Sequence, residues 1–177
     1  MPPFGDPVAR FLIVGLAPGM HGANRTGRPF TGDHAGILLY QMLYKYGFGS
    51  AAASVSTDDG LVLRNCRITN AVKCLPPDNK PVGAEINTCN TFLANELALL
   101  PDNALVLALG GIAHRAILKA LGVRQADFKF AHAALHDVAN IRLLDSYHCS
   151  RYNTNTGRLT GAMFDAVFAE ARELLDK

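Results

Sequence analysis

Short, continuous apolar runs alternate along the chain with longer segments in which apolar residues recur at helical spacing. Four such runs are bounded by polar or glycine-rich stretches, as is typical of buried strands, at residues 10–16, 66–72, 104–109 and 141–146. Helices are predicted at about residues 33–46, 83–99, 111–122 and 158–175. In the last of these, one face gathers the apolar residues Met163, Val167, Ala171 and Leu174.

Strands that alternate with helices predict a parallel sheet covered by helices on both faces. The chain has 177 residues, enough to bury a core of its own, and contains no linker, repeat or low-complexity segment. We therefore expect residues 1–177 to form a single α/β domain. Its centre should be a four-stranded parallel sheet flanked by helices on both faces.

The composition is that of a globular protein, because 49% of the residues are apolar and 18% are charged. With a formal net charge of only +2, any affinity for nucleic acid requires local clusters of basic residues. The first residues lack the pattern of a secretory signal, and no apolar run is long enough to span a bilayer. The four cysteines show no disulfide-framework spacing. We expect a cytoplasmic protein without membrane contact.

Three polar segments stand out against this apolar framework, and each begins near the end of a predicted strand. They cover residues 15–33, 69–74 and 146–153, and the first contains five of the sixteen glycines. In an open parallel sheet, ligands bind outside the carboxyl ends of the strands. We therefore expect the three segments to converge on one ligand site.

The same segments resemble a known family of DNA-repair enzymes. The letters GLAPG (15–19), HGANRTGR (21–28) and FTGD (30–33) resemble the first motif of the family-5 (type B) uracil-DNA glycosylases. SYH (146–148) with NTNTGRLT (153–160) is similar to the last motif, and AVKC (71–74) with PP (76–77) and NKP (79–81) to the middle segment. The resemblance implies an α/β/α sandwich that hydrolyses the N-glycosidic bond of uracil in DNA and leaves an abasic site. It leaves hypoxanthine, xanthine and other deaminated bases open as further substrates.

The resemblance also implies roles for individual side chains in a pocket that holds an extruded base. Phe30 would stack on uracil, and the amide of Asn70 would present a donor and an acceptor to its O4 and N3–H edge. His148 would donate to uracil O2, where negative charge develops as the glycosidic bond breaks. His114, which lies in an apolar helix, is by contrast expected to be structural.

The residue that activates the attacking water is less clear from the motifs. Many uracil glycosylases have Asp or Asn in the first motif at the place where this chain has Ala17, a residue of the implied uracil pocket. We therefore take Asp33 as the candidate catalytic carboxylate, with Asn24 and His21 behind it. The alternative is that Asp33 only caps the helix that follows it.

Basic and amide side chains in the first and last motifs are plausible contacts to DNA phosphates, with ordinary solvated loop charges as the alternative. The predicted DNA contacts are Asn24, Arg25, Arg28, Arg151, Asn153 and Arg158. The expected partner is DNA that contains uracil or other deaminated bases, bound by a monomer.

Family-5 enzymes generally hold a [4Fe-4S] cluster with four cysteines. Cys74 and Cys89 match the second pair of ligands, and the first pair would precede the start of this chain. Cys66 is expected to be packed within a strand. Two explanations stay open: the natural protein is longer, with an N-terminal cysteine-bearing segment, or this member has lost the cluster.

Two other functions compete with base excision. A thiol hydrolase would use Cys149, but its neighbour His148 is a poor base for it, because adjacent side chains on an extended chain point apart. A non-catalytic nucleic-acid or nucleotide-binding domain would bind DNA and leave uracil in place. A P-loop is disfavoured because no Gly-Lys-Ser/Thr ends the glycine-rich segment.

Overall fold

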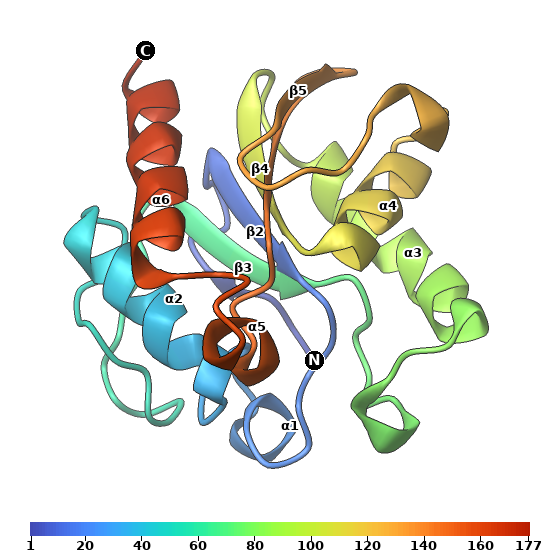
Figure 1. Ribbon diagram of the computed structural model, residues 1–177. Coiled ribbons are helices and arrows are strands. Elements are labelled where there is room, and N and C mark those ends of the chain that lie inside the picture. Colours follow the sequence, from blue (N-terminus) through green and yellow to red (C-terminus); the bar gives the residue numbers. More distant parts are fainter.

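The protein folds around a six-stranded mixed sheet with helices on both faces (Figure 1). The computed structural model describes residues 1–177, apart from the side chain of Asn79. The strand order is β1-β3-β2-β4-β6-β5. The strands are β1 (Phe4–Gly5), β2 (Phe11–Gly15), β3 (Cys66–Asn70), β4 (Ala104–Leu109), β5 (Leu135–Val138) and β6 (Ile141–Ser146).

The four predicted strands form the parallel centre of the sheet, in the order β3, β2, β4, β6. The expectation of four strands is incomplete, because β1 and β5 add an antiparallel strand at each edge. Neither edge strand has the continuous apolar run that marks a buried strand. β1 has two residues, and β5 alternates exposed and partly buried positions before Val138.

The helices are α1 (Ala23–Thr26), α2 (His34–Lys45), α3 (Gly83–Ala98), α4 (Gly111–Ala120), α5 (Arg151–Asn155) and α6 (Gly161–Asp176). Two 3-10 segments lie at Pro77–Asn79 and Gln125–Asp127. The four predicted helices correspond to α2, α3, α4 and α6, and α6 starts three residues later than predicted. The sequence pattern missed α1 and α5, because helices of four and five residues have too few turns to show a period.

The central strands β2 and β4 bury both of their faces, which explains their unbroken apolar runs. In β2, Phe11 and Ile13 pack in the cluster that α2 and α6 cover, whereas Leu12 and Val14 pack in the cluster that α3 and α4 cover. Figure 1 shows the two helix pairs on opposite sides of the sheet. Each large apolar side chain that is fully buried in this way contributes about 1.5–3 kcal/mol to the free energy of folding.

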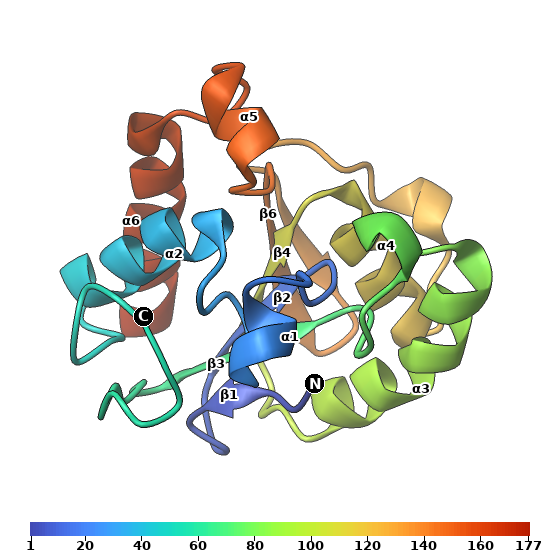
Figure 2. The same ribbon diagram turned by 90° about the horizontal axis from the view of Figure 1, so that it is seen from below.

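The carboxyl ends of the parallel strands share one edge of the sheet. The short helices α1 and α5 lie in two of the predicted polar segments, and both are found at this edge, below the sheet in Figure 1. In Figure 2, which views the molecule from below, α1 faces the viewer. None of the described helices combines the length and apolarity that a membrane-spanning segment needs.

Candidate active site

A cavity of about 290 Å³ opens at the carboxyl edge of the parallel strands. It is lined by Ala17, Gly19, Phe30, Asp33, His34, Ala35, Asn70, His148, Ser150 and Arg151. All three predicted polar segments contribute to this lining, so the expected convergence is observed. The cavity brings together Ala17, Phe30, Asn70 and His148, for which the resemblance implies a place in the base site, and Asp33, the candidate catalytic carboxylate.

The ring of Phe30 is held in the cavity wall by an unusual backbone. Phe30 has a φ of 57°, a left-handed conformation that costs a bulky residue about 1–3 kcal/mol and is concentrated at functional sites. Two glycines make room for it. A Cβ on Gly36 would lie 1.7 Å from the carbonyl oxygen of Phe30, and a Cβ on Gly15 would lie 2.5 Å from its ring and 2.5 Å from Asn70 Oδ1. Gly15 and Gly36 therefore allow Phe30 and Asn70 to pack closely.

Two buried polar atoms in the cavity wall have no hydrogen-bond partner within the protein. Among the described residues, three buried side-chain atoms are unpaired in this way: Asn70 Oδ1, His148 Nδ1 and Arg142 Nε. The first two belong to residues that line the cavity. An unpaired buried polar atom costs about 1–3 kcal/mol, so Asn70 Oδ1 is suited to accept a hydrogen bond from a bound ligand and His148 Nδ1 to donate or accept one.

His148 is a neutral imidazole at physiological pH. Burial lowers its pKa to about 4, because the charged ring would lose its hydration. Two hydrogen bonds hold the main chain at residues 147–148: Asn153 Nδ2 donates to the His148 carbonyl over 2.8 Å, and the Tyr147 N–H donates to His132 Nδ1 over 3.1 Å. Asn153, a predicted DNA contact, thus supports the loop that presents His148.

Asp33 occupies the N-cap position of α2, but its side chain does not cap the helix. Its Oδ2 instead accepts a hydrogen bond from the Ala23 N–H over 3.0 Å. Gly22 and Gly19 leave space for the carboxylate, since a Cβ at these positions would lie 1.8 and 2.6 Å from Asp33 Oδ1. Burial raises the pKa of Asp33, and the hydrogen bond from Ala23 opposes the rise. A carboxylate with a raised pKa in a cavity is a candidate general base.

The other two water-activating candidates are placed differently. His21 and Asn24 are exposed, and neither lines the cavity. Of the predicted phosphate contacts, Arg25, Arg151 and Arg158 are exposed, and Arg151 also lines the cavity.

Arg28 does not fit its predicted role as a DNA contact. Its side chain is 5% exposed, and its Nη1 donates to Asp59 Oδ1 and to Ser54 Oγ, each over 2.8 Å. Its Nη2 donates to the Thr57 carbonyl, and the guanidinium lies over the ring of Phe4. Burial of Asp59 would raise its pKa, but Arg28 and nearby backbone N–H groups hold this pKa far below its usual range. Arg28 is therefore a buried structural cation, with no free face for a phosphate.

The cysteines fall into two environments. Cys74 is exposed, whereas Cys89 is buried on α3, where its Sγ accepts a hydrogen bond over 3.4 Å from the N–H of Lys73, the residue before Cys74. Cys66 and Cys149 are completely buried in the core that α2 and α6 cover. Burial raises the pKa of the Cys149 thiol to about 12, which argues against the thiol-hydrolase alternative. Cys74 and Cys89 are two of the four cysteine ligands that a [4Fe-4S] cluster usually needs, and Cys66 and Cys149 are packed elsewhere.

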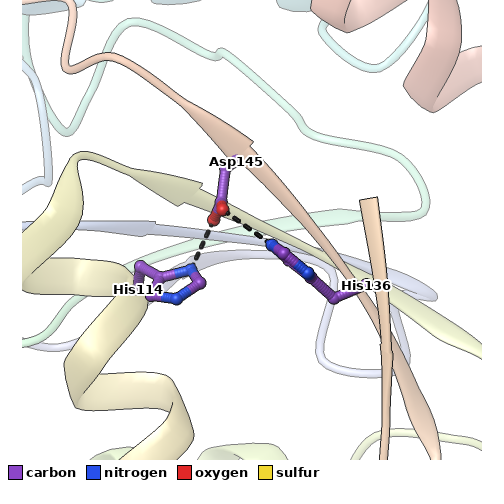
Figure 3. A group of neighbouring side chains, drawn as sticks. All are labelled: His114, His136 and Asp145. Atoms are coloured by element: carbon purple, nitrogen blue, oxygen red, sulfur yellow. Dashed lines mark hydrogen bonds and ion pairs between the residues drawn. The ribbon is translucent and has the colours of Figure 1, made fainter. Parts of the chain in front are cut away.

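Figure 3 shows a buried group that the sequence did not reveal, formed by His114, His136 and Asp145. His114 Nδ1 donates to Asp145 Oδ1 over 2.7 Å, and His114 Nε2 donates to the Phe128 carbonyl over 2.9 Å. His136 Nε2 lies 3.1 Å from Asp145 Oδ2. A carboxylate and a carbonyl both accept, so the form of His114 that fits this site is the protonated ring, which donates from both nitrogens. This is the only His, Cys, Asp or Glu triplet close enough to hold a metal among the described residues, but each carboxylate oxygen already meets a ring nitrogen.

The charge on His114 makes the folded state sensitive to alkaline pH. Burial lowers the pKa of His114, but the hydrogen bonds to Asp145 and Phe128 outweigh burial and raise it above 6.5. The resulting stabilisation is complete below pH 6.5 and is lost as the pH rises through the folded-state pKa. We expect the midpoint of urea unfolding to fall between pH 6.5 and pH 9 by more in the wild type than in His114→Asn. If the urea midpoint fell equally in the two proteins, the alkaline loss of stability would not come from the charge on His114.

Comparison with known proteins agrees with the chemistry of the cavity. The family model described as the uracil DNA glycosylase superfamily matches residues 2–172. The chain is 49% identical to the type-5 uracil-DNA glycosylase of Thermus thermophilus, over 98% of this chain and 80% of the relative. It is 48% identical to the type-5 enzyme of Pyrobaculum aerophilum, over 90% of this chain and 70% of the relative. It is 43% identical to the type-5 enzyme of Mycobacterium tuberculosis, over 98% of this chain and 66% of the relative.

Proposed function

The chain belongs to the uracil-DNA glycosylase superfamily, and we propose that it hydrolyses the N-glycosidic bond of uracil in DNA and leaves an abasic site. The main support is the cavity at the carboxyl edge, where the ring of Phe30 and two unpaired buried atoms, Asn70 Oδ1 and His148 Nδ1, come together. An extruded uracil has an apolar face and a polar edge that would satisfy these groups.

Asn70 would select the base by its edge. Its unpaired Oδ1 would accept from uracil N3–H, and its Nδ2 would donate to O4. Cytosine has an acceptor at N3 and a donor at C4, so it would leave both bonds unmade, and unpaired buried groups give strong discrimination. Hypoxanthine and xanthine also carry an N–H beside a carbonyl, and we propose them as further substrates.

His148 and Asp33 would act on the two sides of the breaking bond. The neutral ring of His148 would donate one N–H to uracil O2 as negative charge develops there, with no proton lost or gained by the ring. Asp33 would orient the water that attacks the anomeric carbon and accept its proton, held toward the cavity by the Ala23 N–H. Ala17 would line the base site without a polar contact of its own.

Excision of uracil is tested with a labelled oligonucleotide that contains one uracil, followed by alkali. We expect strand cleavage at that position only. A protein that binds the oligonucleotide but produces no alkali-sensitive site would instead be the non-catalytic DNA-binding domain.

We propose that the protein works as a monomer, which sedimentation of the same preparation tests. We also propose a cytoplasmic location, which suits four free thiols.

The exposed arginines would neutralise phosphates around the cavity. We propose Arg25, Arg151 and Arg158 for this role, with the exposed amide of Asn24 and the partly buried amide of Asn153 beside them. Each phosphate contact contributes close to one to the slope of log affinity against log salt concentration. We expect alanine at any one of the three arginines to lower this slope by about one. As a control, alanine at the exposed Arg124, next to the 3-10 segment Gln125–Asp127, should leave the slope unchanged.

We propose that Cys74 and Cys89 supply two thiolate ligands to a [4Fe-4S] cluster. Cys66 and Cys149 lie in the core that α2 and α6 cover, on the opposite face of the sheet from α3, which carries Cys89, so we do not propose them as ligands. Such a cluster would bind and brace the segment that follows β3, and the hydrolysis needs no electron transfer. Iron and sulfide analysis of anaerobically purified protein checks this. Iron-free protein that is folded and active would remove the cofactor from the proposal.

A further inference from the structure

A second cavity, of about 380 Å³, adjoins the proposed uracil pocket. The two cavities share the lining residues Phe30, Asp33, His34 and Arg151. The second cavity has neither Asn70 nor His148 in its lining, so it lacks the groups proposed to read the edge of uracil. It is therefore a separate subsite that continues the same groove.

The walls of the second cavity are apolar on two sides. One wall is formed by Ile37 and Gln41, which lie one turn apart on α2. Residues 52–55 form another wall. Ile37 is 59% exposed and Val55 is 71% exposed, so both apolar side chains are free to contact a ligand in the cavity. Two exposed apolar side chains with an amide and a guanidinium nearby suit a flat ring with apolar faces and a polar edge.

This subsite is preformed rather than left to a loose loop. Ser54 Oγ accepts from Arg28 Nη1 over 2.8 Å and lies 2.7 Å from Thr31 Oγ1. The Val55 N–H donates to Asp59, the partner of Arg28. The buried Arg28 thus joins the wall at residues 52–55 to the loop that holds Phe30, which explains why this arginine of the first motif points inward.

We propose that the second cavity binds the nucleobase of a nucleotide directly next to the extruded uracil. The proposal rests on the function proposed above. It is favoured by continuity with the uracil pocket and by Arg151, which lines both cavities and can contact the phosphate that joins the two nucleotides. The protein would then hold two consecutive nucleotides of one strand, and the neighbour of the lesion would affect the rate of excision.

The test combines base deletion in the substrate with side-chain deletion in the protein. Single-stranded oligonucleotides with one uracil are compared with versions in which the base on the 5′ or the 3′ side is replaced by a stable abasic residue. Rates are measured at single turnover, and binding by fluorescence anisotropy. In the wild type we expect one of the two deletions to weaken binding or excision about tenfold, as for one stacked base.

In the double variant Ile37→Ala/Val55→Ala, we expect this penalty to disappear, because the intact oligonucleotide has lost the same contact. Phe92→Ala is the matched control, since Phe92 is 58% exposed on α3, outside the groove, and this variant should keep the penalty. Equal rates and affinities for all three oligonucleotides in the wild type would overturn the subsite, as would a penalty that persists in the double variant. Failure to excise uracil from every oligonucleotide would overturn the function, and the anisotropy data would still decide the subsite.

Discussion

We expect the His148→Ala variant to excise uracil about 10²- to 10³-fold more slowly than the wild type, with nearly unchanged affinity for DNA. The size follows from the loss of one donor aimed at a developing negative charge in a site with little water. Since the charge on uracil O2 exists mainly in the transition state, the loss should appear in the single-turnover rate and only weakly in substrate binding.

The pH profile shows whether His148 acts in its neutral form. Because burial lowers its pKa to about 4, the ring is neutral across pH 5–8 and its donor strength does not change. We expect no decline in rate from His148 over that range, and His148→Gln, which keeps an N–H donor, should recover part of the loss. A rate that fell tenfold for each pH unit above 5 in the wild type, but not in His148→Gln, would show that the imidazolium is the working form.

For Asp33→Asn we expect a loss of about 10²-fold or more in the excision rate, as for removal of a general base. The amide has the same shape and can still accept from the Ala23 N–H, so the loop and α2 should stay in place. It cannot take a proton from water. Urea unfolding of the variant, at a midpoint near that of the wild type, provides the control for folding.

The acid side of the pH profile gives a second test of Asp33. Its pKa is raised above 3.8, so the wild-type rate should fall as the pH drops through this raised value, where the carboxylate becomes protonated. Asp33→Asn should lack this acid limb. If Asp33→Asn excised uracil at the full wild-type rate, Asp33 would have no part in the mechanism, and a group other than a carboxylate at this position would have to orient the water.

Much of the scaffold could be predicted because its signals are local. A strand buried on both faces needs an unbroken apolar run, so the runs around Ile13 and Leu107 identified β2 and β4 without knowledge of their neighbours. The edge strand β5 could not be found in this way. It pairs with β6 through its backbone, while half of its side chains remain in contact with solvent.

The sequence by itself determined the parallel centre of the sheet, the four long helices and the segments that supply the site, because periodicity, turn residues and motif order are properties of neighbouring positions. Only the tertiary structure decided what the polar side chains of those segments do. Arg28 lies inward because Asp59, distant in sequence, is beside it, and Asp33 binds the Ala23 N–H instead of capping α2. The Asp145 carboxylate is buried in an apolar strand because His114 and His136 approach it from two other elements. A polar or charged side chain finds its partner through space, and the sequence near it does not say which partner that is.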